Sequence, residues 1–195
     1  MQSRPKQGKI FVISAVSGAG KTTISNKLLE LYHDAFDISK VVTYTSRPQR
    51  QGEIDGKDYH FLALDEFKKL NNEGFFLETT EYAGNFYGSP ASIINDLAIG
   101  KSFLIVTDRP GALHFKTLIP GAVLIWIFVQ DIDTIRQRLS LRNSESSKQL
   151  ENRLSLAEQE TAAEKQSPMF DYHVKNDKVD QAVAQIHEII KAALT

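Results

Sequence analysis

The feature that most constrains this chain is a glycine-rich turn between a short apolar run and a helical pattern. The apolar run covers residues 10–13, and the turn contains Gly18, Gly20, Lys21 and Thr22. Glycines allow backbone N–H groups to turn inward around an anion, and the start of a helix adds a positive dipole end. A strand, a glycine loop and a helix in this order predict a phosphate-binding loop of the Walker A kind.

Two side chains of this loop have chemistry that suits ATP. Lys21 would reach the β- and γ-phosphates, and the Thr22 hydroxyl would bind Mg²⁺. The residues expected to bind ATP in the loop are Ser17, Gly18, Ala19, Gly20, Lys21, Thr22 and Thr23. Ala15 replaces the first glycine of the pattern, which costs about 1 kcal/mol only if that position needs a positive φ. The alternative is a glycine-rich turn that caps a helix by chance.

Hydrophobic patterning extends the same arrangement along the chain. Consecutive apolar residues, typical of strands covered on both faces, occur at 10–13, 103–106 and 123–129. Helical patterns occur at 21–32, 131–141 and 179–193. Strands that alternate with helices predict an α/β fold with a largely parallel sheet.

Composition excludes several classes of function. The 23 Lys and Arg residues balance the 24 Asp and Glu residues, so charge points to neither a nucleic-acid nor a membrane partner. The chain has no cysteine, which excludes disulfides and thiolate metal sites. The first residues lack the apolar run of a secretory signal, and no apolar stretch is long enough to span a bilayer. We expect a cytoplasmic protein with small-molecule partners, and the oligomeric state stays open.

The stretch from about residue 40 to residue 89 breaks the α/β rhythm. It is rich in Gly, Tyr, Phe and charged residues, with short strand-like fragments at 43–45, 59–61 and 86–87 and a helical pattern at 64–71. We predict an inserted small mixed α/β lobe at 38–93, within a core formed by 1–37 and 94–195. A polar, serine-rich stretch near 140–150 is either a mobile lid or a solvated loop.

Sequence segments in this lobe resemble the guanylate kinase family of P-loop nucleoside monophosphate kinases. The segments are Thr43-Tyr-Thr-Ser-Arg-Pro-Gln-Arg50, Gly52-Glu-Ile-Asp-Gly-Lys-Asp-Tyr59-His-Phe61, Phe76-Leu-Glu78 and Gly84-Asn-Phe-Tyr87-Gly-Ser89. The resemblance runs from about residue 8 to residue 190. It implies transfer of the γ-phosphoryl group of ATP to GMP, giving ADP and GDP in purine nucleotide metabolism, with Mg²⁺ as the cofactor.

The lobe residues also have chemistry that suits a nucleoside monophosphate. Arg47 and Arg50, three positions apart, could grip one phosphate with two planar forks. Tyr59 and Tyr87 could each donate a phenolic hydrogen bond to the same phosphate. Taken singly, the arginines would be a solvated charged turn and the tyrosines core packing.

The base would be read by polar side chains from the same lobe. Glu78 could accept from the two adjacent N–H donors of guanine, and a buried Glu78 would be left unpaired against adenine. A hydroxyl at Thr43 could donate to O6 of the base, and Ser89 could add a polar contact.

Asp108 follows the apolar run at 103–106, at the strand end where ligands bind in such sheets. With Arg109-Pro-Gly-Ala112 it resembles the family's D-x-Q-G-[AV], which implies a place beside the guanosine and near the metal. Val106 stands where the family typically has a second acid, and Pro110 where it usually has Gln. A missing carboxylate could weaken Mg²⁺ or water positioning.

Basic residues near the lid resemble the family's transfer arginines. Arg138, Arg142 and Arg153 could neutralise charge on the transferring phosphoryl group. Arg138 and Arg142, one helical turn apart, could instead form ion pairs on a wet helix. By the same resemblance Asn176 lies near adenine, and its alternative is a polar cap at a strand end.

Two other functions remain open at this point. The first is a P-loop kinase of another small phosphorylated acceptor, against which Glu78 and Thr43 argue. The second is a guanylate kinase-like binding domain with weak or no catalysis, which Ala15 and Val106 would fit.

Overall fold

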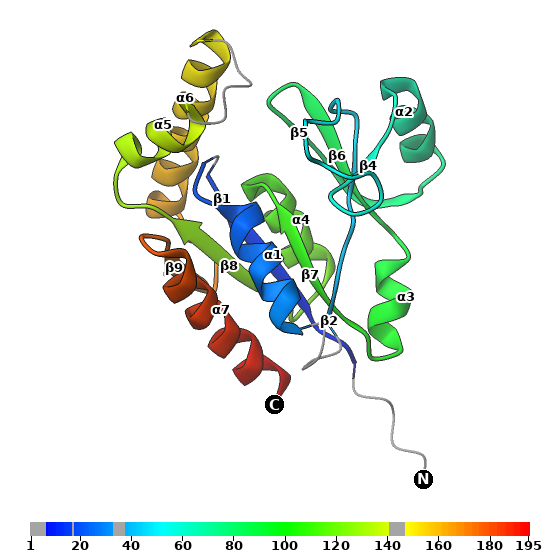
Figure 1. Ribbon diagram of the computed structural model, residues 1–195. Helices are drawn as coiled ribbons and strands as arrows, with labels where there is room; N and C mark the ends of the chain where they lie inside the picture. Colours follow the sequence, from blue (N-terminus) through cyan, green and yellow to red (C-terminus); the bar gives the residue numbers. More distant parts are fainter. Residues whose placement is uncertain (1–6, 17, 33–37, 141–146) are drawn as a thin grey trace.

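The structure is a computed structural model that describes residues 7–16, 18–32, 38–140 and 147–195 (Figure 1). Two residues expected in the site, Ser17 and Arg142, lie outside the described residues. The same holds for positions 141–146 of the expected lid.

The core is a five-stranded, fully parallel sheet, so the predicted fold class is confirmed. Its strand order is β2-β7-β1-β8-β9. The strands are β1 (Ile10–Ala15), β2 (Ile38–Lys40), β7 (Ser102–Thr107), β8 (Val123–Phe128) and β9 (Tyr172–Lys175). Every residue of β1 is buried, as its uninterrupted apolar sequence predicts for a central strand.

Helices cover both faces of this sheet. From β1 the chain crosses to β2 through α1 (Lys21–Tyr32), and from β7 it crosses in the opposite direction to β8 through α4 (Arg109–Leu118). Because such crossovers are right-handed, the two helices lie on opposite faces. The last helix, α7 (Val179–Leu194), packs beside α1, as Figure 1 shows.

The lobe carries a second, four-stranded sheet in the order β4-β3-β6-β5. Its elements are β3 (Tyr44–Thr45), β4 (His60–Phe61), α2 (Leu64–Asn72), β5 (Phe76–Tyr82) and β6 (Asn85–Pro90). A short helix, α3 (Ile93–Ala98), leads back to the core. Ile38–Lys40 pair with β7 in the core sheet, so the boundary expected at residue 38 moves to about residue 41.

Two further helices lie beside the phosphate loop (Figure 1). They are α5 (Ile132–Ser140) and the 20-residue α6 (Ser147–Gln166). Part of the stretch expected as a lid, residues 147–150, is therefore the first turn of α6. Among the described residues, no helix is both long and apolar enough to cross a membrane.

Candidate active site

A cleft of about 710 Å³ lies between the phosphate loop, the lobe and α6. It gathers side chains that are far apart in the sequence. The predicted site residues that line it are Gly18, Gly20, Lys21, Thr22, Thr43, Arg47, Arg50, Tyr59, Glu78, Tyr87, Asp108 and Arg153. The loop expected for ATP and the lobe expected for the acceptor therefore face one cavity.

The phosphate loop has the backbone geometry that its glycines permit. Gly18 and Gly20 have φ values of +82° and +95°, a region that L side chains rarely adopt. Ala15 is instead the last residue of β1, in extended backbone, so the alanine at this position stores no strain. The Lys21 ammonium donates a hydrogen bond to the Ala15 carbonyl, across the base of the loop.

Asn176 and Arg138 lie on the outer side of the same loop. Asn176 is buried and its Nδ2 donates to the Ala19 carbonyl at 2.7 Å, while Arg138 donates to the Asn176 carbonyl at 3.2 Å. Both residues line a second pocket of about 420 Å³, next to the first turn of α5. Asn176 Oδ1 is buried and has no hydrogen-bond partner among the described residues.

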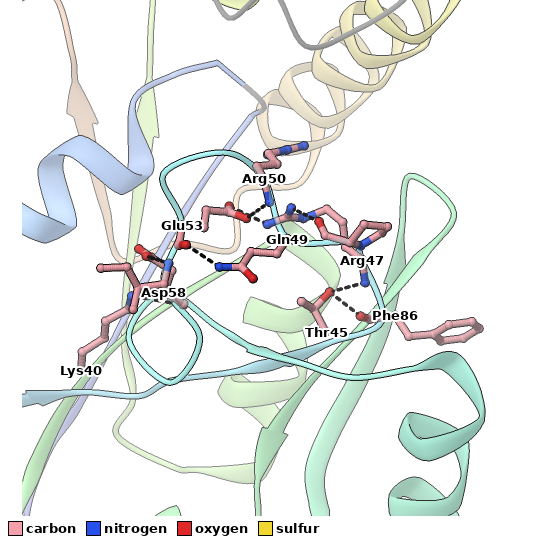
Figure 2. A network of polar contacts seen from close by, with 10 residues as sticks. Lys40, Thr45, Arg47, Gln49, Arg50, Glu53, Asp58 and Phe86 are labelled. Carbon is pink, nitrogen blue, oxygen red and sulfur yellow. Dashed lines mark hydrogen bonds and ion pairs between the residues drawn. The ribbon is translucent and has the colours of Figure 1, made fainter.

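One carboxylate connects the two lobe arginines (Figure 2). Glu53 Oε1 lies 2.7 Å from an Arg47 guanidinium nitrogen, and Glu53 Oε2 accepts the Arg50 backbone N–H at 2.8 Å. Arg47 also donates to the Pro48 carbonyl at 2.7 Å, and its backbone N–H donates to Thr45 Oγ1 at 3.1 Å. The orientation of the Arg47 guanidinium is therefore fixed by the lobe itself.

The electrostatics of these groups indicate an anion site. Burial tends to lower the pKa of Arg47, but the hydrogen bond and charge of Glu53 outweigh it and raise that pKa. Burial and the like charges of Arg47 and Arg153 lower the pKa of Arg50. Burial would raise the pKa of Glu53, yet its bonds to Arg47 and to the Arg50 N–H lower it. The guanidinium groups of Arg47, Arg50 and Arg153 thus act on one another, and Glu53 offsets part of their charge.

Aromatic rings wall this basic end of the cleft. The Arg47 guanidinium lies 5.4 Å from the centroid of the Tyr59 ring and 5.6 Å from that of Phe61. Tyr59 and Tyr87 meet edge to face with their centroids 6.0 Å apart. Burial raises the pKa of Tyr59 to about 12, so its hydroxyl stays a hydrogen-bond donor at neutral pH.

The other end of the lobe cleft holds a buried acid. The Glu78 side chain is 4% exposed, and its Oε1 accepts the Ser89 hydroxyl at 2.7 Å. Ser89 is fully buried behind Glu78 and does not line the cleft. Thr43, directly before β3, is also buried but lines the cleft. Burial raises the pKa of Glu78, and the Ser89 hydrogen bond opposes that rise.

Asp108 joins the core sheet to the lobe. It is the N-cap of α4, where Oδ1 accepts the Gly111 N–H at 2.7 Å. Its Oδ2 accepts the hydroxyl of Thr80, on β5, at 3.1 Å. Val106, two residues earlier, lines the cleft as an apolar wall.

Several residues of this region are not predicted by the sequence pattern. Glu53 lies three positions after Arg50, and this short spacing could have indicated an acid that pairs with the arginines. Thr80, Tyr82 and Glu160 meet the site only through tertiary contacts, which no local pattern announces. Thr23 and Ala19, expected at the ATP, do not line the cleft.

The donor set around the cleft is poor in metal ligands. Within the described residues, no group of three His, Asp or Glu side chains comes together that could hold a metal ion alone. Thr22, whose side chain carries a hydroxyl, lines the cleft beside Lys21. This set fits a hard cation that takes most of its ligands from phosphate oxygens and water.

A parallel sheet with a glycine loop at the start of its first helix, facing a basic cleft under an inserted lobe, defines a P-loop nucleotide-binding protein. Comparison with known proteins narrows this class. The family model described as guanylate kinase matches residues 7–193.

Individual relatives agree with the family model. A guanylate kinase of Lactococcus lactis subsp. lactis (strain IL1403) is 37% identical over 188 residues, 96% of this chain and 89% of the relative. One from Thermus thermophilus is 37% identical over 95% of this chain and 82% of the relative. The crystal structure of guanylate kinase from Anaplasma phagocytophilum superposes with a TM-score of 0.78 at 32% identity, covering 96% and 87% of the two chains. The chain belongs to the guanylate kinase family.

Proposed function

We propose that this protein transfers the γ-phosphoryl group of ATP to GMP, giving ADP and GDP. The observation that carries the proposal is the single cleft that joins the phosphate loop to Arg47, Arg50 and Glu78. A nucleoside monophosphate needs a phosphate grip and a base reader within one acceptor site. The family relatives, which carry the name guanylate kinase, support the same reaction.

The acceptor phosphate would bind at the basic end of the cleft. Arg47 and Arg50 supply paired charged forks, and Tyr59 and Tyr87 supply phenolic donors. A buried arginine already held by Glu53 loses little conformational freedom when the phosphate binds, so its fork is preorganised.

The guanine base would bind at the other end, against Glu78. Its carboxylate accepts from guanine N1–H and the exocyclic amine, Thr43 donates to O6, and Ser89 orients the carboxylate from behind. Adenine lacks the adjacent donor pair and would leave the buried carboxylate unpaired, which can reduce kcat/KM by about four orders of magnitude. Asp108 closes this side of the acceptor site.

ATP would bind at the phosphate loop, with its adenine towards the second pocket. The loop amides and Lys21 hold the β- and γ-phosphates, and the buried acceptor Asn176 Oδ1 suits the exocyclic amine of adenine. The expected ATP contacts of Ser17, Ala19 and Thr23 remain predictions of the sequence.

Transfer needs no covalent enzyme intermediate. Lys21, Arg138 and Arg153, with Arg142 from outside the described residues, would neutralise the charge that spreads over the transferring oxygens. Bound Mg²⁺ would supply further charge neutralisation on the phosphates, with Thr22 as its protein ligand. Both Asp108 oxygens already accept hydrogen bonds from the protein, so Thr22 is the better candidate of the two.

We divide the chain into a kinase core, an acceptor lobe and a lid accordingly. The core holds the phosphate loop, the lobe between about residue 41 and residue 93 reads GMP, and the lid expected near 140–150, of which 141–146 lie outside the described residues, would close over ATP. Closure would exclude water that could otherwise hydrolyse ATP.

An acceptor screen tests the proposal. A coupled assay measures ADP release from Mg²⁺-ATP with GMP, AMP, UMP or CMP as the acceptor. We expect rapid ADP release with GMP and not with the other three acceptors. Equal ADP release with another acceptor would identify a different kinase. No ADP release with any acceptor, from a protein shown to be folded, would favour a guanylate kinase-like binding domain.

A further inference from the structure

The base-reading acid, Glu78, is in an environment that opposes its charge. Its side chain is 4% exposed, and Oε2 has no hydrogen-bond partner among the described residues. Burial is the largest cause that raises the pKa of Glu78, and the negative charge of Asp108 raises it further. A protonated Glu78 would lose the second acceptor that a 2-amino-6-oxopurine requires.

Three groups from different elements act on Glu78. Ser89, on β6, donates to Oε1, and Asp108, at the end of β7, adds a like charge. His114, on α4, brings its Nδ1 within 3.7 Å of Oε2, which is the oxygen left without a hydrogen bond among the described residues. The charge of His114 opposes both burial and Asp108 and lowers the pKa of Glu78.

The fold explains why His114 reaches this acid. Asp108 caps α4, which fixes where the helix starts, and α4 packs against β5, the strand that carries Glu78. His114 comes at the middle of α4, with a side chain that is 48% exposed. It does not line the cleft, so it meets Glu78 without occupying the space of a bound base.

We propose that His114 is a positioning residue for base recognition, a cation beside Glu78 that keeps this carboxylate ionised as the double acceptor for guanine. The inference rests on the proposed GMP site and deepens it. It makes a prediction that a purely structural role would not, because the benefit of His114 depends on its charge. An imidazole is charged below a pH of about 6.5 and neutral well above it.

The direction of the pH effect follows from these charges. Well above the pH range in which an imidazole carries charge, a histidine supplies no cation, so removing the side chain at 114 should change GMP binding little. Acidification favours the protonated form of Glu78, whose pKa burial and Asp108 raise, and a cation 3.7 Å from Oε2 opposes that protonation. A variant without that charge should lose affinity for GMP on the acidic side.

The test compares His114→Gln and His114→Lys with the wild-type protein, measuring the GMP dissociation constant by calorimetry and KM for GMP by the coupled assay. We expect the variant-to-wild-type ratio for His114→Gln to be about 1 near pH 8 and about five- to tenfold near pH 5.5. Protonation of the GMP phosphate affects the variant and the wild type equally, so it does not change this ratio. We expect kcat to be unchanged, and His114→Lys to keep the wild-type affinity at both pH values.

The control is His173→Gln, another half-exposed histidine, whose Nε2 lies 3.0 Å from the buried carboxylate of Glu164, outside the lining of the cleft. Its ratio should stay near 1 at both pH values. A ratio for His114→Gln that is the same at both pH values would overturn the inference, as would wild-type protein that does not bind GMP. GMP binding without turnover would contradict the proposed reaction while leaving this test of His114 in force.

Discussion

The Glu53 carboxylate bridges two arginines, with Oε1 2.7 Å from the Arg47 guanidinium and Oε2 2.8 Å from the Arg50 backbone nitrogen. The Arg47 side chain is 8% exposed, so without this acid its charge would be buried and unpaired. The bridge holds the guanidinium under the Tyr59 ring before any phosphate arrives. Preorganisation of this kind predicts an effect on acceptor binding rather than on the chemical step.

Glu53→Gln should therefore raise KM for GMP about tenfold or more, since a hydrogen bond to a charged group contributes about 1.5–3 kcal/mol. The values of kcat and of KM for ATP should change much less. Steady-state kinetics with each substrate varied in turn measures the split. Glu81→Gln is the matched control, because Glu81 is an exposed acid of the same lobe, and an equal effect there would contradict the role of Glu53.

Lys21→Met should reduce kcat by about two to three orders of magnitude, as the loss of one preorganised charge at a transferring group does elsewhere. The GMP dissociation constant should stay close to that of the wild type, because the acceptor contacts lie in the lobe. Single-turnover rates and GMP titrations measure the two quantities. Lys27→Met, also on α1 but in an exposed ion pair with Asp180, should leave both unchanged.

Alanine substitutions at two glycines distinguish the effect of backbone strain from the effect of a clash at the ATP site. Gly20 and Gly121 have similar φ values, +95° and +93°, so alanine at either position costs about 1–2 kcal/mol of stability. A Cβ at Gly20 would come within 2.5 Å of Asn176 Nδ2, whereas one at Gly121 meets nothing within 4 Å.

Both Gly→Ala variants should therefore unfold more easily, and only Gly20→Ala should raise KM for ATP. Thermal denaturation and ATP titration measure the two effects. An unchanged KM in Gly20→Ala would show that Asn176 does not contribute to donor binding.

Much of the core could be predicted from the sequence because its signals are local. Consecutive apolar residues marked β1, β7 and β8, and α1 begins and ends where its periodicity predicts. The 20-residue α6 gives a weak local signal, because its apolar residues do not gather on one face. The short β2 and β9 give little local signal, and pairing with neighbouring strands makes them part of the sheet.

The candidate site divides in the same way. Arg47, Arg50 and Glu78 could be named because they stand in a recognisable pattern along the chain. The position of His114 beside Glu78 depends on how α4 packs against β5, and that of Glu160 on how α6 packs near Lys21 and Asp108. Such relationships join residues far apart along the chain, so no sequence window contains them.

Glu160 makes stability depend on pH. Burial is the main cause that raises its pKa from 4.5 to about 7, with Lys21 opposing and Asp108 adding to the rise. Between these values the unfolded chain has released a proton that the folded chain retains, so stability falls as pH rises. The shift corresponds to roughly 3 kcal/mol of folding stability, and this contribution is fully lost above a pH of about 7.

Glu160→Gln removes this titration. The variant should match the wild type near pH 4.5 and become more stable than it as pH rises towards 8, by an amount on the order of the shift. Urea denaturation at several pH values measures the difference. A stability difference that does not grow with pH would contradict the burial of an acid at this position.

In the proposed reaction the γ-phosphoryl group of ATP passes to GMP and not to water. The most direct measurement follows label from γ-labelled ATP into products in the presence of GMP, with AMP as the comparison acceptor. We expect label in the β-phosphate of GDP, in amounts equal to the ADP formed. With AMP as the acceptor, we expect no labelled ADP. Label in inorganic phosphate alone, or transfer to AMP as readily as to GMP, would contradict the proposed reaction.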